Sequence, residues 1–543
     1  MKINNYLKNF FYGGLIFVAF IFIIRPLLHG GFFPTFDDVQ VVRIDQMTRE
    51  LIHGQFPVRY ANDLGNGAGY MFFNFYSPLV YYIGAFIHIV GVPLVRATKI
   101  VFILGYLIGA LSMFAVLKKR VNLLASVLGT ILFLFSAYFS YEVYTRGTLA
   151  EFFGIAIFPL CFGLTLWLKE KPTTLVSLVL GLVLGLLVYA HIFIAINAVL
   201  LGFVVFLFPR FSRKQYIFGG LSLAIGALIS ASFWMPLLLE EKFTQYSANY
   251  FATSSYKTNL LSIFQLLGFQ NIAWGFKPPV LGLSISIGII IAIIGFIFLR
   301  KKNYLFLGSL VACLISLFLA SNLSSFLWNS SDFLKMLQFP WRFLAGATVA
   351  GIFAISLFVN QLKIKWGITV SLLLIVLALS NISYFHPLTY NYIAVYTADD
   401  PCSSTTWAAE YLPKWTSVCL PKPTKKAVPL VASTTLETKI DSVSESSFGR
   451  TISFKVITRN GSQVLIRRYY FPGWNVFVDG KKVGSRPFGK EGLIEVNVPS
   501  GTHTVMVLWQ GTLVENLSNW ISFASFFALL IFLLNYKKYK KLL

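Results

Sequence analysis

Charged residues are scarce in this sequence. Only 12% of the 543 residues are charged, against roughly a quarter in an ordinary soluble domain. Apolar residues make up 56%, and the mean hydropathy over the whole chain is +0.71. This balance excludes a soluble protein with one core. It predicts an integral membrane protein, because apolar stretches of about 20 residues, long enough to cross a hydrocarbon layer of about 30 Å, recur along the chain.

Cysteine and histidine are also scarce, with four and six residues. No His/Cys cluster has the spacing of a zinc site, and the chain lacks a Walker A loop, a dinucleotide fingerprint and a nucleophile elbow. An enzyme with this sequence would use neither ATP nor NAD, so it would take an activated substrate that is already in the membrane. No organic cofactor is predicted, and a divalent metal stays an open alternative.

The four cysteines fall into two pairs. Cys161 and Cys313 lie in apolar stretches, where a buried thiol is an ordinary small core residue. Cys402 and Cys419 lie in polar sequence rich in Pro, Ser and Thr, and an oxidising compartment would permit a disulfide between them. Two free thiols are the alternative if the exterior of the cell is reducing.

The net charge of +24 would suggest nucleic-acid binding in a soluble protein. Here the basic residues cluster at alternate ends of the apolar stretches, which is the positive-inside bias of membrane proteins. We therefore expect no nucleic-acid partner. The expected location is a bacterial or archaeal plasma membrane. The clusters are Lys118 to Arg120, Lys169 with Lys171, Arg210 with Arg213 and Lys214, Arg300 to Lys302, Lys363 with Lys365, and Lys537 to Lys541.

With these clusters as cytoplasmic markers, the hydropathy pattern predicts a polytopic α-helical protein with about twelve spans and both termini in the cytoplasm. The parity requires that 78–90 lies along the outer membrane face instead of crossing. The predicted spans are 10–28, 97–117, 121–139, 150–168, 173–190, 192–208, 216–237, 280–299, 303–320, 343–361, 366–384 and 520–536.

A polar insert precedes the last span. From Thr451 onward its apolar residues alternate with polar ones at period two, and Asn460-Gly461 and Asp479-Gly480 are tight-turn signals. These features predict an extracytoplasmic antiparallel β-sandwich near the C-terminus. The predicted domains are a transmembrane domain at 1–384 with a first outer loop at 30–96, a β-rich domain at 385–519, and a final helix with a basic tail at 520–543.

The first outer loop contains two adjacent acids, Asp37 and Asp38, before a predicted amphipathic helix at 39–53 that would lie on the membrane. Thr35 and Asp38 resemble a capping box, so one interpretation is that the acids only begin the helix. The other is that a carboxylate held at a helix start accepts a proton. Of the two, Asp38 is predicted to face away from the Val41–Ile44 stripe, toward an aqueous cavity.

Further charged residues lie at the other outer boundaries, where a charge usually faces a cavity or a partner because lipid cannot satisfy it. Arg59 would bind a phosphate oxygen or pair with Asp63. Arg342 would bind a lipid phosphate near the first-loop acids or extend to lipid head groups. His191 is interpreted as a helix-end residue capped by water. The candidate binding residues are Arg59, Asp63, Tyr76, Glu142, Arg146, Glu151 and Arg342.

The segments that contain these residues resemble the membrane proteins called 6-pyruvoyl-tetrahydropterin synthase-related, and the late segments also resemble the YfhO-like membrane proteins. A pterin synthase needs a zinc-binding histidine triad, which the sequence does not offer. The segments are Phe36-Asp37-Asp38, Arg59, Tyr76 to Leu79, Arg146 to Glu151, Gln338 to Phe343, Glu410 to Pro413, Tyr470 to Trp474, and Val478 to Gly480.

The layout is similar to that of the GT-C superfamily of membrane glycosyltransferases. This resemblance implies inverting transfer of a sugar from a polyprenyl-phosphate donor to an extracytoplasmic glycan, lipid or protein, with Asp38 or Asp37 as the catalytic residue. The chain departs from many relatives at Asp37, where they have histidine. A lipid or polysaccharide transporter and a non-enzymatic envelope assembly factor are the alternatives, although the sequence lacks the two related halves typical of transporters.

Overall fold

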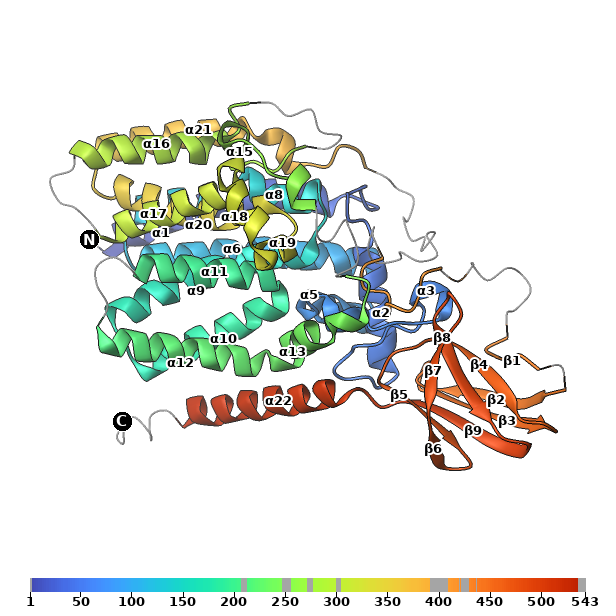
Figure 1. The fold of residues 1–543 in the computed structure, drawn as a ribbon. Helices are drawn as coiled ribbons and strands as arrows, with labels where there is room; N and C mark the ends of the chain where they lie inside the picture. Colours follow the sequence, from blue (N-terminus) through green and yellow to red (C-terminus); the bar gives the residue numbers. More distant parts are fainter. Residues whose placement is uncertain are drawn as a thin grey trace.

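The computed structural model describes residues 2–206, 212–246, 255–270, 277–298, 304–390, 409–418, 420, 429–435 and 437–535. Most of them form a helical bundle, and antiparallel strands gather at one end of it (Figure 1). The bundle helices are α1 (Lys2–Ile24), α6 (Leu94–Lys118), α7 (Leu123–Leu134), α8 (Ala137–Tyr144), α9 (Leu149–Glu170), α10 (Thr174–Ala190), α11 (Ile192–Phe206), α12 (Arg213–Ile229), α13 (Ala231–Glu240), α16 (Leu283–Phe298), α17 (Tyr304–Ala320), α20 (Leu344–Val359), α21 (Ile364–Leu379) and α22 (Leu513–Leu534).

Six helical segments are long and apolar enough to cross a membrane, and a seventh is added if the bent pair α12–α13 is one span. Six further apolar helices have 10–17 residues. Each predicted span therefore overlaps one or two helices, while the count of twelve crossings stays a prediction. The six long segments are Leu7–Leu28, Leu94–Lys118, Leu123–Tyr144, Leu149–Glu170, Pro340–Val359 and Leu513–Leu534.

The predicted span at 216–237 is not one straight helix. It breaks at Ser230, where α12 and α13 meet at 76°. Beyond the break, α13 packs against α22 and against α4 of the first loop, and the backbone N–H of Ser232 donates to Ser522 on α22 (2.7 Å). The bend therefore brings the end of α13 under the first loop.

The first loop is a folded cap. It contains α2 (Gln40–Ile52), α3 (Leu64–Gly67), α4 (Phe72–Phe75) and α5 (Leu79–Ile89). Val41, Ile44 and Met47 of α2 are buried as an apolar stripe, in agreement with their helical spacing. The opposite, polar side of α2 is buried as well, because its residues pack against other parts of the protein. The stretch 78–90 coincides with α5, which packs on α2 and α6; its placement along the membrane face stays a prediction.

The strands form two antiparallel sheets, ordered β1-β4-β8-β7 and β2-β3-β9-β5-β6. Inward residues of both sheets, such as Phe454 and Ile466, belong to one buried hydrophobic cluster, as the period-two pattern predicts. We call strands β1–β9 the β-domain. The strands are β1 (Val431–Ser433), β2 (Lys439–Ser446), β3 (Thr451–Thr458), β4 (Ser462–Tyr469), β5 (Trp474–Val478), β6 (Lys481–Val483), β7 (Ser485–Phe488), β8 (Leu493–Val498) and β9 (Gly501–Trp509).

The first loop and the β-domain share one core. Tyr60, Met71 and Phe75 belong to the same buried cluster as the strands. The backbone N–H of Tyr469 donates to the carbonyl oxygen of Ala68 (3.1 Å). Two segments almost 400 residues apart in the sequence thus contribute to one continuous core. The predicted domain boundary near residue 385 lies between these two segments in the sequence.

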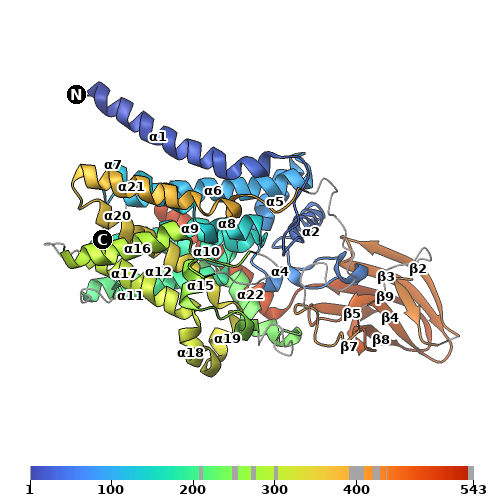
Figure 2. The same cartoon turned by 90° about the horizontal axis from the view of Figure 1, so that it is seen from above.

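The first and last helices of the bundle place both ends of the described chain on the same side of the molecule. α1 begins and α22 ends at the end of the bundle that lies away from the β-domain, and Figure 2 shows α1 diverging from the other helices toward its N-terminal end. Short helical segments complete the described chain. They are α15 (Ile263–Leu267), α18 (Ser325–Ser330), α19 (Asp332–Met336), η1 (Arg25–Leu28), η2 (Glu241–Phe243), η3 (Asn322–Ser324), η4 (Pro340–Phe343) and η5 (Ile382–Phe385).

Candidate functional site

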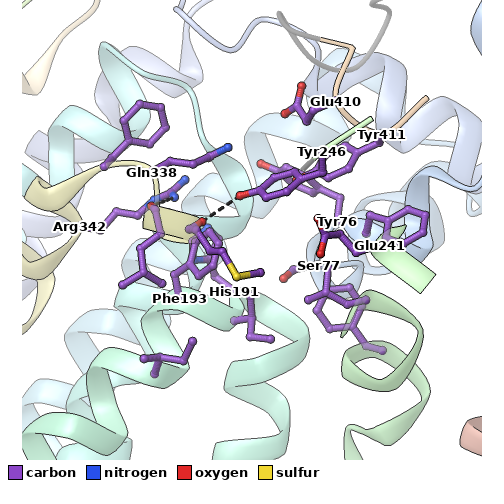
Figure 3. A pocket seen from close by; sticks show the side chains of 18 of the residues that line it. Tyr76, Ser77, His191, Phe193, Glu241, Tyr246, Gln338, Arg342, Glu410 and Tyr411 are labelled. Carbon is purple, nitrogen blue, oxygen red and sulfur yellow. Dashed lines mark hydrogen bonds between the residues drawn. The ribbon is translucent and has the colours of Figure 1, made fainter. Parts of the chain in front are cut away.

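A cavity of about 200 Å³ lies where the bundle, the first loop and the segment leading to the β-domain meet (Figure 3). One part of its wall is apolar and comes mainly from α11, α13 and α19. The other part is unusually rich in charge for a site at the end of membrane helices. The polar and ionisable lining residues are Asp37, Arg43, Tyr76, Ser77, Arg146, His191, Glu241, Tyr246, Gln338, Arg342, Glu410 and Tyr411.

Of the two first-loop acids, Asp37 lines the cavity. Its backbone N–H donates to the carbonyl oxygen of Arg146 (2.7 Å), so the loop is held beside that arginine. Asp38 is exposed and lies outside the cavity lining. Partial desolvation and the neighbouring Asp37 carboxylate raise the pKa of Asp38.

The capping interpretation of Asp38 finds no counterpart in the structure. α2 begins at Gln40, its N-cap is Val39, and no side chain caps it. The sequence-based prediction that Asp38 is the acting carboxylate depends on a helix that starts near Thr35. With the helix start shifted to Gln40, both acids lie on a turn, and their directions follow from the loop's contacts and not from helical spacing.

Arg146 and Arg342 reach the cavity from separate elements and share one partner, Glu151 of α9. The Glu151 carboxylate lies 2.6 Å from Nη1 of Arg146 and 3.1 Å from Nε of Arg342. Glu142 also accepts from Arg146 (3.2 Å), and Tyr138 donates to Glu151 (3.0 Å). Glu142 and Glu151 are almost fully buried and lie behind the cavity wall, where they fix the direction of the two guanidinium groups.

Both arginines keep donors available on the cavity side. Among the described residues, Nε and Nη2 of Arg146 and Nη2 of Arg342 have no hydrogen-bond partner. Burial by itself would lower the pKa of Arg146, but Glu142, Glu151 and Asp37 raise it well above its ordinary value, so the group stays charged. Charged N–H groups in a fixed geometry suit a phosphate or carboxylate ligand.

A third arginine, Arg43 of α2, lines the same cavity. Its guanidinium carbon lies 4.2 Å from the centre of the Tyr76 ring, and Nη1 donates to Tyr81 (3.0 Å). Burial would lower the pKa of Arg43, whereas Tyr81, Tyr76 and Asp37 raise it, so it too stays charged. Asp37 therefore lies within the electrostatic field of both Arg43 and Arg146.

Two candidate residues lie elsewhere. Arg59 donates to Asn74 (2.6 Å), to the carbonyl oxygen of Ser232 (2.9 Å) and to Asn519 of α22 (2.5 Å), and it does not line the cavity. Asp63, the partner considered for it from the sequence, instead lies 3.3 Å from Nη1 of Arg49. These two residues hold the first loop together.

His191 lies in the cavity wall, at the junction of α10 and α11. Its Nε2 is 3.8 Å from the Glu151 carboxylate, and its Nδ1 is buried without a hydrogen-bond partner among the described residues. The sequence suggests only that His191 ends a helix and is capped by water. Nothing in the sequence indicates that it belongs to the cavity wall. Cys402 and Cys419, with the disulfide considered for them, lie outside the described residues.

Several lining residues were not candidates from the sequence: Arg43, Glu241, Tyr246, Gln338, Glu410 and Tyr411. Gln338, Glu410 and Tyr411 belong to the segments that carry the family resemblance, which is the signal that could have identified them. Arg43 is indistinguishable in sequence from a solvated residue of an amphipathic helix. In the described part of the chain, no group of three or more His, Cys, Asp or Glu residues could hold a metal ion.

Comparison with solved structures gives distant similarities. The arabinofuranosyltransferase AftD from Mycobacteria is 12% identical with a TM-score of 0.44, over 69% of this chain and 26% of that chain. The oligosaccharyltransferase of Archaeoglobus fulgidus in the apo form is 11% identical with a TM-score of 0.45, over 78% of this chain and 62% of that chain. The chain thus spans about a quarter of the first protein and less than two thirds of the second.

No curated protein matches the sequence significantly. The family model described as 6-pyruvoyl-tetrahydropterin synthase related domain, a membrane protein, matches residues 73–390. This range is longer than half of the chain and includes most of the bundle, with Arg146, Glu151, Gln338 and Arg342. The chain belongs to the 6-pyruvoyl-tetrahydropterin synthase related family of membrane proteins.

Proposed function

We propose that this protein is a membrane glycosyltransferase that transfers a sugar from a polyprenyl-phosphate donor to an extracytoplasmic acceptor. The observation that carries this proposal is the cavity at the end of the membrane helices, where the first-loop carboxylate of Asp37 lies together with the three arginines Arg43, Arg146 and Arg342. A lipid-linked donor needs a site in contact with both the membrane and the aqueous side. It also needs cations for its phosphate.

The reaction follows from these groups. The acceptor oxygen attacks C1 of the sugar, while the bond from C1 to the phosphate oxygen breaks and its electrons leave with the lipid phosphate. The acceptor hydroxyl loses its proton to a first-loop carboxylate, for which we favour Asp37 because it lines the cavity. Arg146 and Arg342 stabilise the charge that develops on the leaving phosphate. Attack from the face opposite the leaving group inverts C1.

The test is turnover of a radiolabelled polyprenyl-phosphate sugar by the purified full chain in liposomes. Asp37→Asn should lower turnover by about a hundredfold or more, since general base catalysis contributes about that much, while Asp38→Asn should stay within about twofold. The reverse result would assign the base to Asp38. Normal turnover in both variants would leave the reaction without a first-loop carboxylate base and contradict the mechanism. Movement of intact donor across the bilayer without loss of its sugar would indicate a transporter.

The proposed sidedness can be tested separately. The basic clusters favour cytoplasmic termini, and the cavity and β-domain lie at the opposite end of the bundle from the start of α1 and the end of α22. We therefore expect a cysteine placed at Asn460, in the turn between β3 and β4, to react with an impermeant reagent in intact cells. Labelling only after lysis would reverse the orientation and contradict an extracytoplasmic reaction.

A further inference from the structure

Gln338 directly follows the end of helix α19 and lines the cavity. Its φ is +62°, the left-handed conformation in which many helices end, and its backbone N–H donates to the carbonyl oxygen of Lys335 in α19 (3.0 Å). Its side chain is 8% exposed and lines the cavity, yet its amide has no hydrogen-bond partner among the described residues. The end of α19 therefore holds Gln338 at the cavity wall, where its amide is available to a ligand.

Glu410 enters the cavity from a different direction. It is 8% exposed and belongs to residues 409–418, a segment we call the strap. The strap pairs with the chain after α13, because the N–H of Gln245 donates to the carbonyl oxygen of Leu412 (3.0 Å) and that of Lys414 donates to Phe243 (2.9 Å). The N–H of Ser417 donates to Lys490 of the β-domain (2.7 Å). The strap thus fixes Glu410 to both the bundle and the β-domain.

Two tyrosine rings pack together where the strap lines the cavity. Tyr411 packs parallel to Tyr246, with ring centres 6.2 Å apart and planes 11° apart. Tyr246 in turn donates to the carbonyl oxygen of Met336 (2.9 Å), two residues before Gln338. Figure 3 shows Gln338, Tyr246 and Glu410 around one part of the cavity, with Arg342 at its side. Gln338 and Glu410 are therefore linked through a rigid aromatic pair.

Charge divides the cavity into two parts. In Figure 3, Arg342 lies on one side of Tyr246, and Glu410 and Glu241 lie on the other; Arg43, Arg146 and Asp37 also line the cavity. Tyr246 is affected by charges of both signs. Burial raises its pKa, Arg342 opposes that rise, and Glu410 and Glu241 add to it. A ligand that fills the cavity would need an anionic group at the arginines and an uncharged, hydroxyl-rich group at the glutamates, because hydroxyls donate to carboxylates and bond an amide in both directions.

We infer that Gln338 and Glu410 form the sugar-binding part of the cavity and select an uncharged sugar ring over an acidic one. This inference rests on the proposed function, whose lipid phosphate occupies the arginine part. A neutral ring can donate hydroxyl hydrogen bonds to Glu410 and to the carbonyl oxygen of the Gln338 amide. A uronic acid would bring a third carboxylate next to Glu241 and Glu410, and like charges at short range exclude a ligand more effectively than a lost contact does.

The test compares three probes on the purified full chain in nanodiscs: decaprenyl phosphate alone, decaprenyl phosphate bearing a neutral hexose, and decaprenyl phosphate bearing a hexuronic acid. We expect the hexose form to bind about tenfold more tightly than the bare lipid phosphate, which corresponds to about 1.4 kcal/mol. The hexuronic form should bind no more tightly than the bare lipid. Dissociation constants can be measured by microscale thermophoresis.

Two variants separate sugar binding from cavity shape. Gln338→Gly removes the amide and suits the positive φ, and Glu410→Gln removes the charge at nearly constant volume. Each should reduce the preference for hexose over bare lipid to about twofold or less, with the affinity for bare lipid unchanged. Glu410→Gln should also improve binding of the hexuronic form. Glu437→Gln, at an exposed glutamate near the β-domain strands, is the matched control and should change nothing.

The outcomes are distinct. An unchanged hexose preference in both variants, or equal losses for bare lipid and hexose, would overturn the inference and leave the lipid-phosphate site standing. Tight binding of the hexuronic form by the unmodified chain would overturn the selection for uncharged rings. Failure of all three probes to bind would contradict the proposed function, and the sugar-binding assignment with it.

Discussion

Arg342 and Arg59 are two arginines at the same end of the bundle, and their surroundings differ in one decisive respect. Both are nearly buried, with 9% and 5% of their surface exposed. Arg342 is fixed by Glu151 and keeps Nη2 without a protein partner among the described residues. Arg59 uses both terminal nitrogens on Asn74, Ser232 and Asn519, and none of its surface lines the cavity.

The comparison shows that burial does not distinguish a functional charge from a structural one. Arg59 joins the first loop to α13 and α22, elements that are distant in sequence, so it stabilises the arrangement that forms the cavity. Arg342 is held from behind, which leaves its other side for a ligand. A charge at a membrane boundary is therefore interpreted correctly only when its hydrogen-bond donors are assigned one by one.

The largest effect should come from Arg342→Lys, which keeps the positive charge beside Glu151 but loses the planar donor geometry. We expect turnover per folded molecule to fall by about a hundredfold, the usual cost of losing one donor to a developing negative charge. Turnover of a radiolabelled polyprenyl-phosphate sugar measures this. Normal turnover would mean that Arg342 only neutralises Glu151.

Arg59→Lys is the matched variant and should show the opposite pattern. A lysine cannot bond Asn74, Ser232 and Asn519 together, and each buried group left unpaired costs about 1–3 kcal/mol of stability. The unfolding midpoint should fall by several degrees, while turnover per folded molecule stays within about twofold. A thiol-reactive dye that detects exposure of the buried Cys161 and Cys313 reports the midpoint. A large loss of turnover with an unchanged midpoint would make Arg59 a ligand of the substrate.

Glu50 is a third buried ionisable residue, located between α2 and the β-domain. Burial raises its pKa from 4.5 to about 8, against the opposing N–H of Asn62 and the Arg450 side chain. The folded state thus retains a proton that the unfolded chain releases above the lower value, so stability should fall as pH rises through this window. Glu50→Gln should flatten the dependence of the midpoint on pH between about 5 and 8. An unchanged slope would assign it to other groups.

The smallest effect is expected at the surface, where Nδ1 of His503 lies 2.6 Å from Asp479. This pair raises the pKa of His503 and lowers that of Asp479. Its stabilisation is present below the ordinary histidine pKa of about 6.5 and disappears as pH rises through the raised value, and also as pH falls through the lowered aspartate value. His503→Gln should shift the midpoint by about 1 °C or less at about pH 6. A shift as large as that of Arg59→Lys would show that exposed pairs also hold this fold.

Several properties follow from the sequence alone. Composition and hydropathy predict a membrane protein, the period-two pattern after Thr451 predicts antiparallel strands, and the quoted segments identify the family; all three are confirmed. These properties depend on residues that are close in the sequence, because the apolar periodicity of a helix or strand is apparent within a short stretch of the chain. The arginines Arg146 and Arg342 were also identifiable, since charges at span ends are rare enough to draw attention.

Only the tertiary structure decides which side chains share the cavity. Asp37, Gln338 and Glu410 come from the first loop, the segment before α20 and the strap, and their convergence depends on long-range packing that no local pattern encodes. The same packing buries Arg59 among bundle and loop residues and moves the start of α2 to Gln40, away from the acids. Hydropathy fixes which segments enter the membrane, whereas the direction of each polar side chain is fixed by partners hundreds of residues away.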